Sequence, residues 1–129
     1  MFIDQLKQAI EDEYKAYHYL QSMERFAKVP MWKSFIEHAY KDEKSHYEMF
    51  QQLHYMLTGE FVQNPRKKLP CHILKDGAKD ALLDKLETIE TYKVMLLTVP
   101  IQQAYNPGFI ALHDEMEHAI RFSTIYNAL

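Results

Sequence analysis

Glycine and proline are scarce in this chain, and they divide it into four long segments. Three glycines and five prolines occur among 129 residues. Within the segments, apolar residues recur every three or four positions, which is typical of amphipathic helices. We predict helices over about residues 4–28, 31–57, 78–99 and from about residue 107 almost to the C-terminus. No strand-like alternation of useful length occurs, so the sequence predicts an all-α fold.

The connections between these segments indicate how the helices are arranged. Short turns join the first helix to the second and the third to the fourth, which implies two antiparallel hairpins. The middle connection, residues 58–77, is long. About 20 extended residues reach roughly 66 Å, whereas a helix of about 27 residues is about 40 Å long. Two hairpins joined by a long crossover form a ferritin-like four-helix bundle, which we expect to be a single domain over residues 1–129.

Composition excludes several classes of function. Charged residues make up 26% of the chain and the net charge is -3, so no basic field attracts nucleic acid or anionic lipid. The single cysteine, Cys71, cannot form an internal disulfide or a cysteine-rich metal site. No apolar run is long enough to span a membrane, and the N-terminus does not resemble a signal peptide. We therefore expect a cytoplasmic protein with no nucleic-acid or membrane partner, in which oxygen and nitrogen donors hold any metal.

Two of the predicted helices carry the same pair of side chains. Glu43 and His46 stand three positions apart in KDEKSHYEMF, and Glu115 and His118 have the same spacing in HDEMEHAI. This spacing places both side chains of a pair on one face of a helix. A single pair is more typical of a solvated face. One pair deep in the second helix of each hairpin instead indicates a shared site.

A site shared by four helices needs a carboxylate from each of the other two. In the first helix, Glu13 lies on a face with Ala9 and Ile10, which predicts that it points inward. In the third helix, Glu87 and Glu90 both lie next to apolar residues, and periodicity does not choose between them.

Buried carboxylates constrain what such a site can contain. Several carboxylates cannot all ionise unpaired in the core, because burying each charge costs several kcal/mol. Two divalent cations would remove that cost, and a set of oxygen and nitrogen donors suits iron or manganese. One Glu from each of two helices and a Glu-x-x-His from each of the others is the pattern of di-iron and di-manganese carboxylate proteins. The sequence therefore predicts two bound metal ions, either iron or manganese, and the resemblance described next favours two iron ions.

Over essentially its whole length, the chain resembles the rubrerythrin-type members of the ferritin-like superfamily. The resemblance rests on AIEDEYKAYHYL, DEKSHYEMF, ETIETYK and DEMEH. It implies that Glu13 and Glu87 are terminal carboxylate ligands and that Glu43 and Glu115 are bridging carboxylates. The nitrogen ligands would be His46 and His118, and Glu90 would be an additional carboxylate ligand. The four-cysteine rubredoxin module of complete rubrerythrins has no counterpart here, so a peroxidase would need a separate electron-donor protein.

The function implied by the resemblance is that of a di-iron oxidoreductase. It would reduce hydrogen peroxide or oxidise Fe(II) with O2, in the context of oxidative stress, and we expect it to form a homodimer. Tyr17, one turn from Glu13, is expected to pack in the core, or else to hydrogen-bond a ligand carboxylate or donate an electron. Iron binding or storage without turnover, and a metal-free structural bundle, are the alternatives.

Overall fold

The computed structural model describes residues 1–63 and 65–129, and within them the chain forms an all-helical bundle without strands. Residue 64, in the expected crossover, lies outside the described residues. Four α-helices and two short 3-10 helices follow one another in the order α1 (Phe2–Met23), η1 (Glu24–Phe26), α2 (Pro30–Thr58), α3 (Leu74–Leu96), η2 (Gln102–Ala104) and α4 (Tyr105–Ala128). The predicted four-helix bundle is confirmed.

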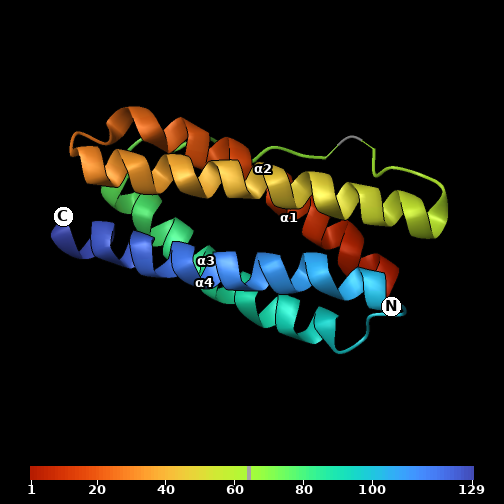
Figure 1. Cartoon of the computed structure of the whole chain (residues 1–129). Helices are drawn as coiled ribbons and strands as arrows, with labels where there is room; N and C mark the ends of the chain where they lie inside the picture. The colour runs from red at the N-terminus through yellow and green to blue at the C-terminus, as the bar shows by residue number, and fades with distance from the viewer. Residues whose placement is uncertain (64) are drawn as a thin grey trace.

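The helices pack as two antiparallel hairpins. α1 packs most extensively on α2 and α3 on α4, while α2 also contacts α4 and α1 contacts α3. In Figure 1 the connection from α2 to α3 runs back along the bundle, so that α3 begins near the end where α1 meets α2. The long crossover inferred from the sequence is therefore present. None of the helices in the described ranges is long and apolar enough to cross a membrane.

Helix boundaries differ from the predicted ones at α3. The Asp76-Gly77 pair was expected to precede the helix, but α3 begins at Leu74 and includes Gly77. A Cβ atom on Gly77 would lie 2.5 Å from Cys71 Sγ and 2.9 Å from Met23 Cε. Gly77 therefore permits close packing of the first turn of α3, and does not mark a turn before it.

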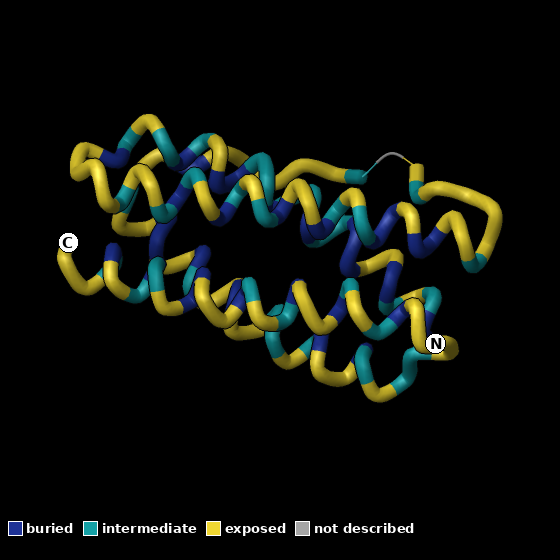
Figure 2. Tube along the Cα trace, viewed as in Figure 1, coloured by how far each residue is buried: buried dark blue, intermediate teal, exposed yellow. Residues whose placement is uncertain are grey.

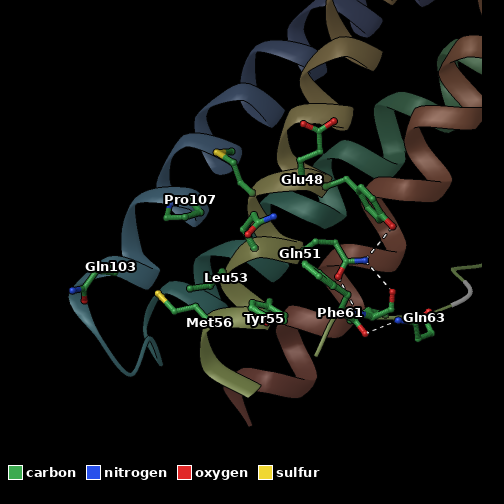
Figure 3. A pocket seen from close by; sticks show the side chains of 13 residues that line it. Glu48, Gln51, Leu53, Tyr55, Met56, Phe61, Gln63, Gln103 and Pro107 are labelled. Atoms are coloured by element: carbon green, nitrogen blue, oxygen red, sulfur yellow. Dashed lines mark hydrogen bonds between the residues drawn. The ribbon is translucent and has the colours of Figure 1, made fainter. Parts of the chain in front are cut away.

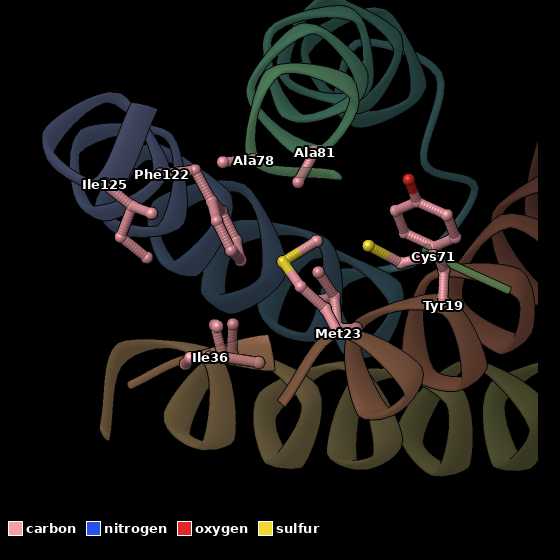
Figure 4. Packing of buried hydrophobic residues seen from close by; sticks show 11 residues of the cluster. Tyr19, Met23, Ile36, Cys71, Ala78, Ala81, Phe122 and Ile125 are labelled. Carbon is pink, nitrogen blue, oxygen red and sulfur yellow. The ribbon is translucent and has the colours of Figure 1, made fainter. Parts of the chain in front are cut away.

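The apolar core has two parts, one toward each end of the bundle. Figure 2 shows buried segments along the inner sides of the helices and exposed segments along the outer sides. In one part, Met23, Ile36, Phe122 and Ile125 come together with small residues of α3, as Figure 4 shows. The other part gathers side chains that include Leu6, Ile10, Phe50, Tyr92 and Met95.

On every helix, a short polar stretch separates the two parts of the core. The buried polar residues there are Glu13 on α1, Glu43 and His46 on α2, Lys85 on α3, and Glu115 and His118 on α4. On α1, Glu13 lies between Ile10 and Leu20, and on α3, Lys85 lies between Ala81 and Tyr92. Apolar packing on both sides therefore aligns the four polar stretches at one level of the bundle.

The packing around Phe122 gives a test of this core. Phe122 is fully buried, whereas Ile120 on the same helix is 69% exposed. We expect Phe122→Ala to lower the free energy of unfolding by about 3–5 kcal/mol, because it leaves a cavity between four helices. Ile120→Ala, the control, should change it by less than about 0.5 kcal/mol. Urea denaturation followed by circular dichroism measures both, and equal effects would contradict this packing.

Candidate metal centre

Four buried side chains from three helices form a group that could hold a metal ion. Glu13, Glu43, His46 and Glu115 each offer one ligand atom, and these atoms all lie within 4.8 Å of one another. Glu13 and Glu43 are 1% exposed, and His46 and Glu115 are fully buried. The inward position predicted for Glu13 is therefore what the structure has. Carboxylate oxygens with an imidazole nitrogen are ligands suited to iron, manganese or zinc.

His46 is held between two helices by both of its ring nitrogens. Its Nδ1 lies 3.1 Å from Glu13 Oε2 and 3.6 Å from Glu115 Oε1, so this nitrogen faces the carboxylates. Its Nε2 lies 2.6 Å from Asp114 Oδ2. Asp114 thus accepts a hydrogen bond from Nε2 and fixes the orientation of the ring.

His118 repeats this arrangement from the opposite hairpin. Its Nδ1 lies 3.0 Å from Glu43 Oε1 and 3.5 Å from Glu115 Oε1, and its Nε2 lies 2.8 Å from Asp42 Oδ2. Histidines that bind metals usually donate their other ring N–H to a carboxylate or carbonyl, which fixes the tautomer and the ring orientation. Both histidines therefore have the surroundings of metal ligands.

The two aspartates are functional candidates that the sequence analysis missed. Each directly precedes the Glu of its motif, so that the pattern is Asp-Glu-x-x-His in α2 and again in α4. Asp42 on α2 binds His118 on α4, and Asp114 on α4 binds His46 on α2. The repeated Asp was visible in the sequence, but the crossing of the contacts between the hairpins was not.

Several buried polar atoms of the group have no hydrogen-bond partner among the described residues. They are Glu43 Oε1, both carboxylate oxygens of Glu115, and Nδ1 of His118. Their neighbours are ion-pair partners: Glu43 Oε1 lies 3.0 Å from His118 Nδ1, and Glu115 Oε2 lies 3.1 Å from Lys85 Nζ. Buried polar atoms without partners are rare in native proteins and call for an explanation such as a bound ion. Since these atoms belong to the same cluster and are of the types that coordinate divalent metals, the donor set fits a metal ion.

Lys85 is the residue that α3 contributes to the cluster, and the sequence analysis did not single it out. Its side chain is 2% exposed. Nζ donates a hydrogen bond to Glu43 Oε2 at 3.1 Å and lies 3.1 Å from Glu115 Oε2. A buried ammonium group thus faces the two carboxylates that were expected to bridge two metals.

The expectation that Glu87 and Glu90 face the site is wrong. Both are exposed on α3, and the Glu90 side chain, 72% exposed, pairs with Lys93 at 3.4 Å. The apolar neighbours on which the prediction depended, Leu83 and Leu86 among them, are themselves about half exposed. Leu83 and Leu86 therefore indicated the outer face of this helix and not its core-facing side.

Tyr92 makes the tyrosine contact that had been considered for Tyr17. The hydroxyl of Tyr92 is buried and donates a hydrogen bond to Glu13 Oε1 at 2.5 Å. Burial, followed by the negative charge of Glu13, raises the pKa of Tyr92 well above its ordinary value, so the hydroxyl keeps its proton. Tyr17 is partly buried and packs edge-on against Tyr40, 5.9 Å away between ring centres. Tyr17 therefore has the packing role.

In the metal-free protein, the buried carboxylates of the cluster stabilise the positively charged forms of Lys85, His46 and His118. Burial alone would lower the pKa of Lys85, but the charges of Glu115 and Glu43 raise it well above its ordinary value. Burial would likewise lower the pKa of His46 and of His118, but the surrounding carboxylates raise both, that of His118 to about 11. Without a metal, the lysine and both histidines are therefore positively charged at neutral pH.

Two surface pockets differ in their relation to this cluster. The broad pocket in Figure 3 lies on the outer side of α2 near the start of α4, where Gln51 binds the Tyr47 hydroxyl and the backbone of Val62. No residue of the cluster lines it. A second pocket, with a volume of about 70 Å³, lies between α1 and α3 and reaches Lys85. Access from the surface thus leads toward the lysine.

Comparison with known proteins shows a similar fold and does not identify a family. A solved structure of a hypothetical protein from Pyrococcus furiosus is similar to this chain, with a TM-score of 0.86 and 17% sequence identity. The alignment covers 98% of this chain and 89% of that chain. No protein-family model matches the chain, and no curated protein matches it. The resemblance to rubrerythrins therefore stays a prediction.

The raised pKa of His118 predicts how the stability of the metal-free protein depends on pH. The charged form is favoured in the folded state, because the pKa is about 11 there against an ordinary value of 6.5. Its contribution to stability is fully present below pH 6.5 and is lost as the pH rises toward 11. We expect the free energy of unfolding to fall over this range, by at most about 1.4 kcal/mol per pH unit for one histidine.

Urea denaturation in the presence of a chelator measures this dependence. His113, which is exposed, provides the control, since His113→Gln should leave the slope unchanged. His118→Gln should make the slope smaller. A stability that stays constant or rises over the same range would contradict the charge assignment.

Proposed function

We propose that this protein is a metal-dependent oxidoreductase whose buried carboxylate and histidine cluster binds iron, or manganese in its place. In this proposal the metal reacts with hydrogen peroxide or with O2. Its ligands are Glu13, Glu43, His46 and Glu115, which form the compact group described above. A bound iron ion supplies reversible one-electron chemistry.

The orientation of the histidines is the observation that carries this proposal. His46 and His118 direct Nδ1 at carboxylate oxygens, and each has Nε2 against an aspartate of the opposite hairpin. A histidine that only fills the core has no need of a carboxylate on each nitrogen. Aspartate partners of this kind orient metal-binding histidines and increase their basicity.

The surrounding residues suit redox chemistry because they exclude bulk water and hold the carboxylates in position. Apolar side chains close the bundle on both sides of the cluster. Tyr92 donates a hydrogen bond to Glu13 and so holds one carboxylate in position. Reduction of hydrogen peroxide to two water molecules takes two electrons and two protons. The electrons would come from a separate donor protein, because Cys71, the single cysteine among these 129 residues, cannot build a four-cysteine electron-transfer site.

Other elements of the functional hypothesis stay predictions of the sequence. They are the resemblance to rubrerythrins, the peroxide or O2 substrate, the electron-donor protein, the homodimer and the cytoplasmic location. Storage of iron within a shell of its own chains would be favoured by a native mass far above that of a dimer. The native mass in solution therefore separates storage from the oxidoreductase.

A metal-free structural bundle is the second candidate, and one observation favours it. Three carboxylates face the centre of the cluster, and Lys85, His46 and His118 are three groups that can carry positive charge against them. Asp42 and Asp114 lie behind the two histidines, so these groups balance most of the negative charge without a metal. This candidate leaves Glu115 Oε1 without a hydrogen bond, because its nearest ion-pair partner among the described residues is His118 Nδ1 at 3.5 Å.

Metal loading of wild-type protein and two variants tests the proposal. Glu13→Gln removes a carboxylate from the cluster. Glu87→Gln makes the same substitution at an exposed glutamate of α3 and is the control. After anaerobic addition of Fe(II) and gel filtration, we expect wild type and Glu87→Gln to retain iron equally. Glu13→Gln should retain at least about tenfold less, because one of four ligands has lost its charge. Elemental analysis measures the iron, and no retention by wild type would favour the metal-free bundle.

Reaction of the loaded protein separates an oxidoreductase from a passive iron-binding protein. Hydrogen peroxide or O2 is added to the Fe(II) form, and the ferric absorbance is followed by stopped-flow spectroscopy. We expect oxidation faster than that of free Fe(II) at the same pH. Iron that remains bound but reacts no faster than free Fe(II) would overturn the oxidoreductase and leave metal binding intact.

A further inference from the structure

Lys85 is not one of the proposed metal ligands, yet its ammonium group contacts two of them. It is the buried polar residue of α3 at the level of the metal ligands, 1% exposed. Its Nζ is 3.1 Å from Glu43 Oε2 and 3.1 Å from Glu115 Oε2. A buried lysine of this kind needs negative charge close by. The two carboxylates that supply this charge are those that a second metal ion would share with the first.

The sequence repeat of the two hairpins shows which position Lys85 occupies. Asp42, Glu43 and His46 of α2 correspond to Asp114, Glu115 and His118 of α4. With this alignment, Lys85 precedes Glu115 by as many residues as Glu13 precedes Glu43. The second hairpin therefore has an ammonium group where the first hairpin has a terminal carboxylate.

This exchange makes the two halves of the cluster chemically different. On the side of His46, an ion would have Glu13 as its own carboxylate and would share Glu43 and Glu115. On the side of His118, the equivalent carboxylate is absent, and a positive charge stands against the shared oxygens. A divalent ion there would lose a ligand and would be repelled by the ammonium group.

We propose that the ammonium group of Lys85 takes the place of a second metal ion, so that each chain binds one divalent ion, on the side of His46. The inference rests on the metal binding in the proposed function, and it changes the two ions expected from the sequence to one. Lys85 is a positioning residue in this account. Its Nζ contacts both Glu43 and Glu115, and so would hold these two carboxylates in place for a metal bound by Glu13, His46 and the same pair.

The small pocket beside Lys85 gives the proposal a practical test. It opens between α1 and α3, and charged residues from both helices line it, among them Asp12, Lys15 and Asp84. Lys85 is one of its lining residues, so position 85 borders a surface pocket. A carboxylate placed at position 85 would lie beside this pocket and against the shared carboxylates.

The experiment compares wild type with Lys85→Glu and with Lys93→Glu. Lys93→Glu makes the same change of charge on an exposed residue of the same helix. Each protein is loaded anaerobically with excess Mn(II), passed through a desalting column, and analysed for manganese per chain. We expect one ion in wild type, one in Lys93→Glu and two in Lys85→Glu. Electron paramagnetic resonance should show an isolated Mn(II) signal in wild type and a spin-coupled pair in Lys85→Glu.

Each other outcome has a definite meaning. Two coupled ions in wild type would overturn the inference and leave metal binding intact, and this holds even if Lys85→Glu fails to fold. A folded Lys85→Glu variant with one ion would also overturn it. One ion in wild type that is inert toward peroxide and O2 after exchange for Fe(II) would overturn the proposed oxidoreductase only. No ion in wild type would overturn both.

Discussion

The burial of three carboxylates at one level of the bundle is the constraint on which the rest of this structure depends. Moving a carboxylate from water into a protein core costs several kcal/mol, and three close together also repel one another. Glu13, Glu43 and Glu115 are each at most 1% exposed. The groups packed around them, Lys85, His46 and His118, offset that cost through charge and hydrogen bonding. The fold is thus compatible with few residue types at this level.

The apolar parts of the core make this arrangement possible. Each helix carries apolar residues on both sides of its polar stretch, so that packing at both ends fixes how far the helices are shifted along one another. A shift by one turn would move a helix by about 5.4 Å and bring a carboxylate against apolar side chains. The polar level and the apolar ends therefore specify the same alignment, which is the agreement between local and global preferences expected of a natural sequence.

The sequence predicted the parts of the site that follow from strong patterns. The two Glu-x-x-His pairs occur in long helices with clear apolar faces, and the inward position of Glu13 followed from its apolar neighbours. The third helix was different, because Leu83, Leu86, Val94 and Leu97 lie on its exposed side. Glu87 and Glu90, which are next to these residues, were therefore expected to face the core. Lys85 was not, since lysine is almost never buried unless it is paired. The carboxylates that pair with Lys85 belong to Glu43 on α2 and Glu115 on α4, so no pattern within α3 could indicate that Lys85 is buried.

If a metal and the Lys85 ammonium group share the carboxylates of this cluster, the position of bound iron should show it. Crystals of the wild-type protein can be soaked anaerobically in Fe(II), with diffraction measured on both sides of the iron absorption edge. We expect one anomalous peak per chain, near Glu13 and His46, with Lys85 Nζ still in contact with Glu43 and Glu115. Two peaks per chain, with the lysine side chain turned out of the cluster, would contradict it.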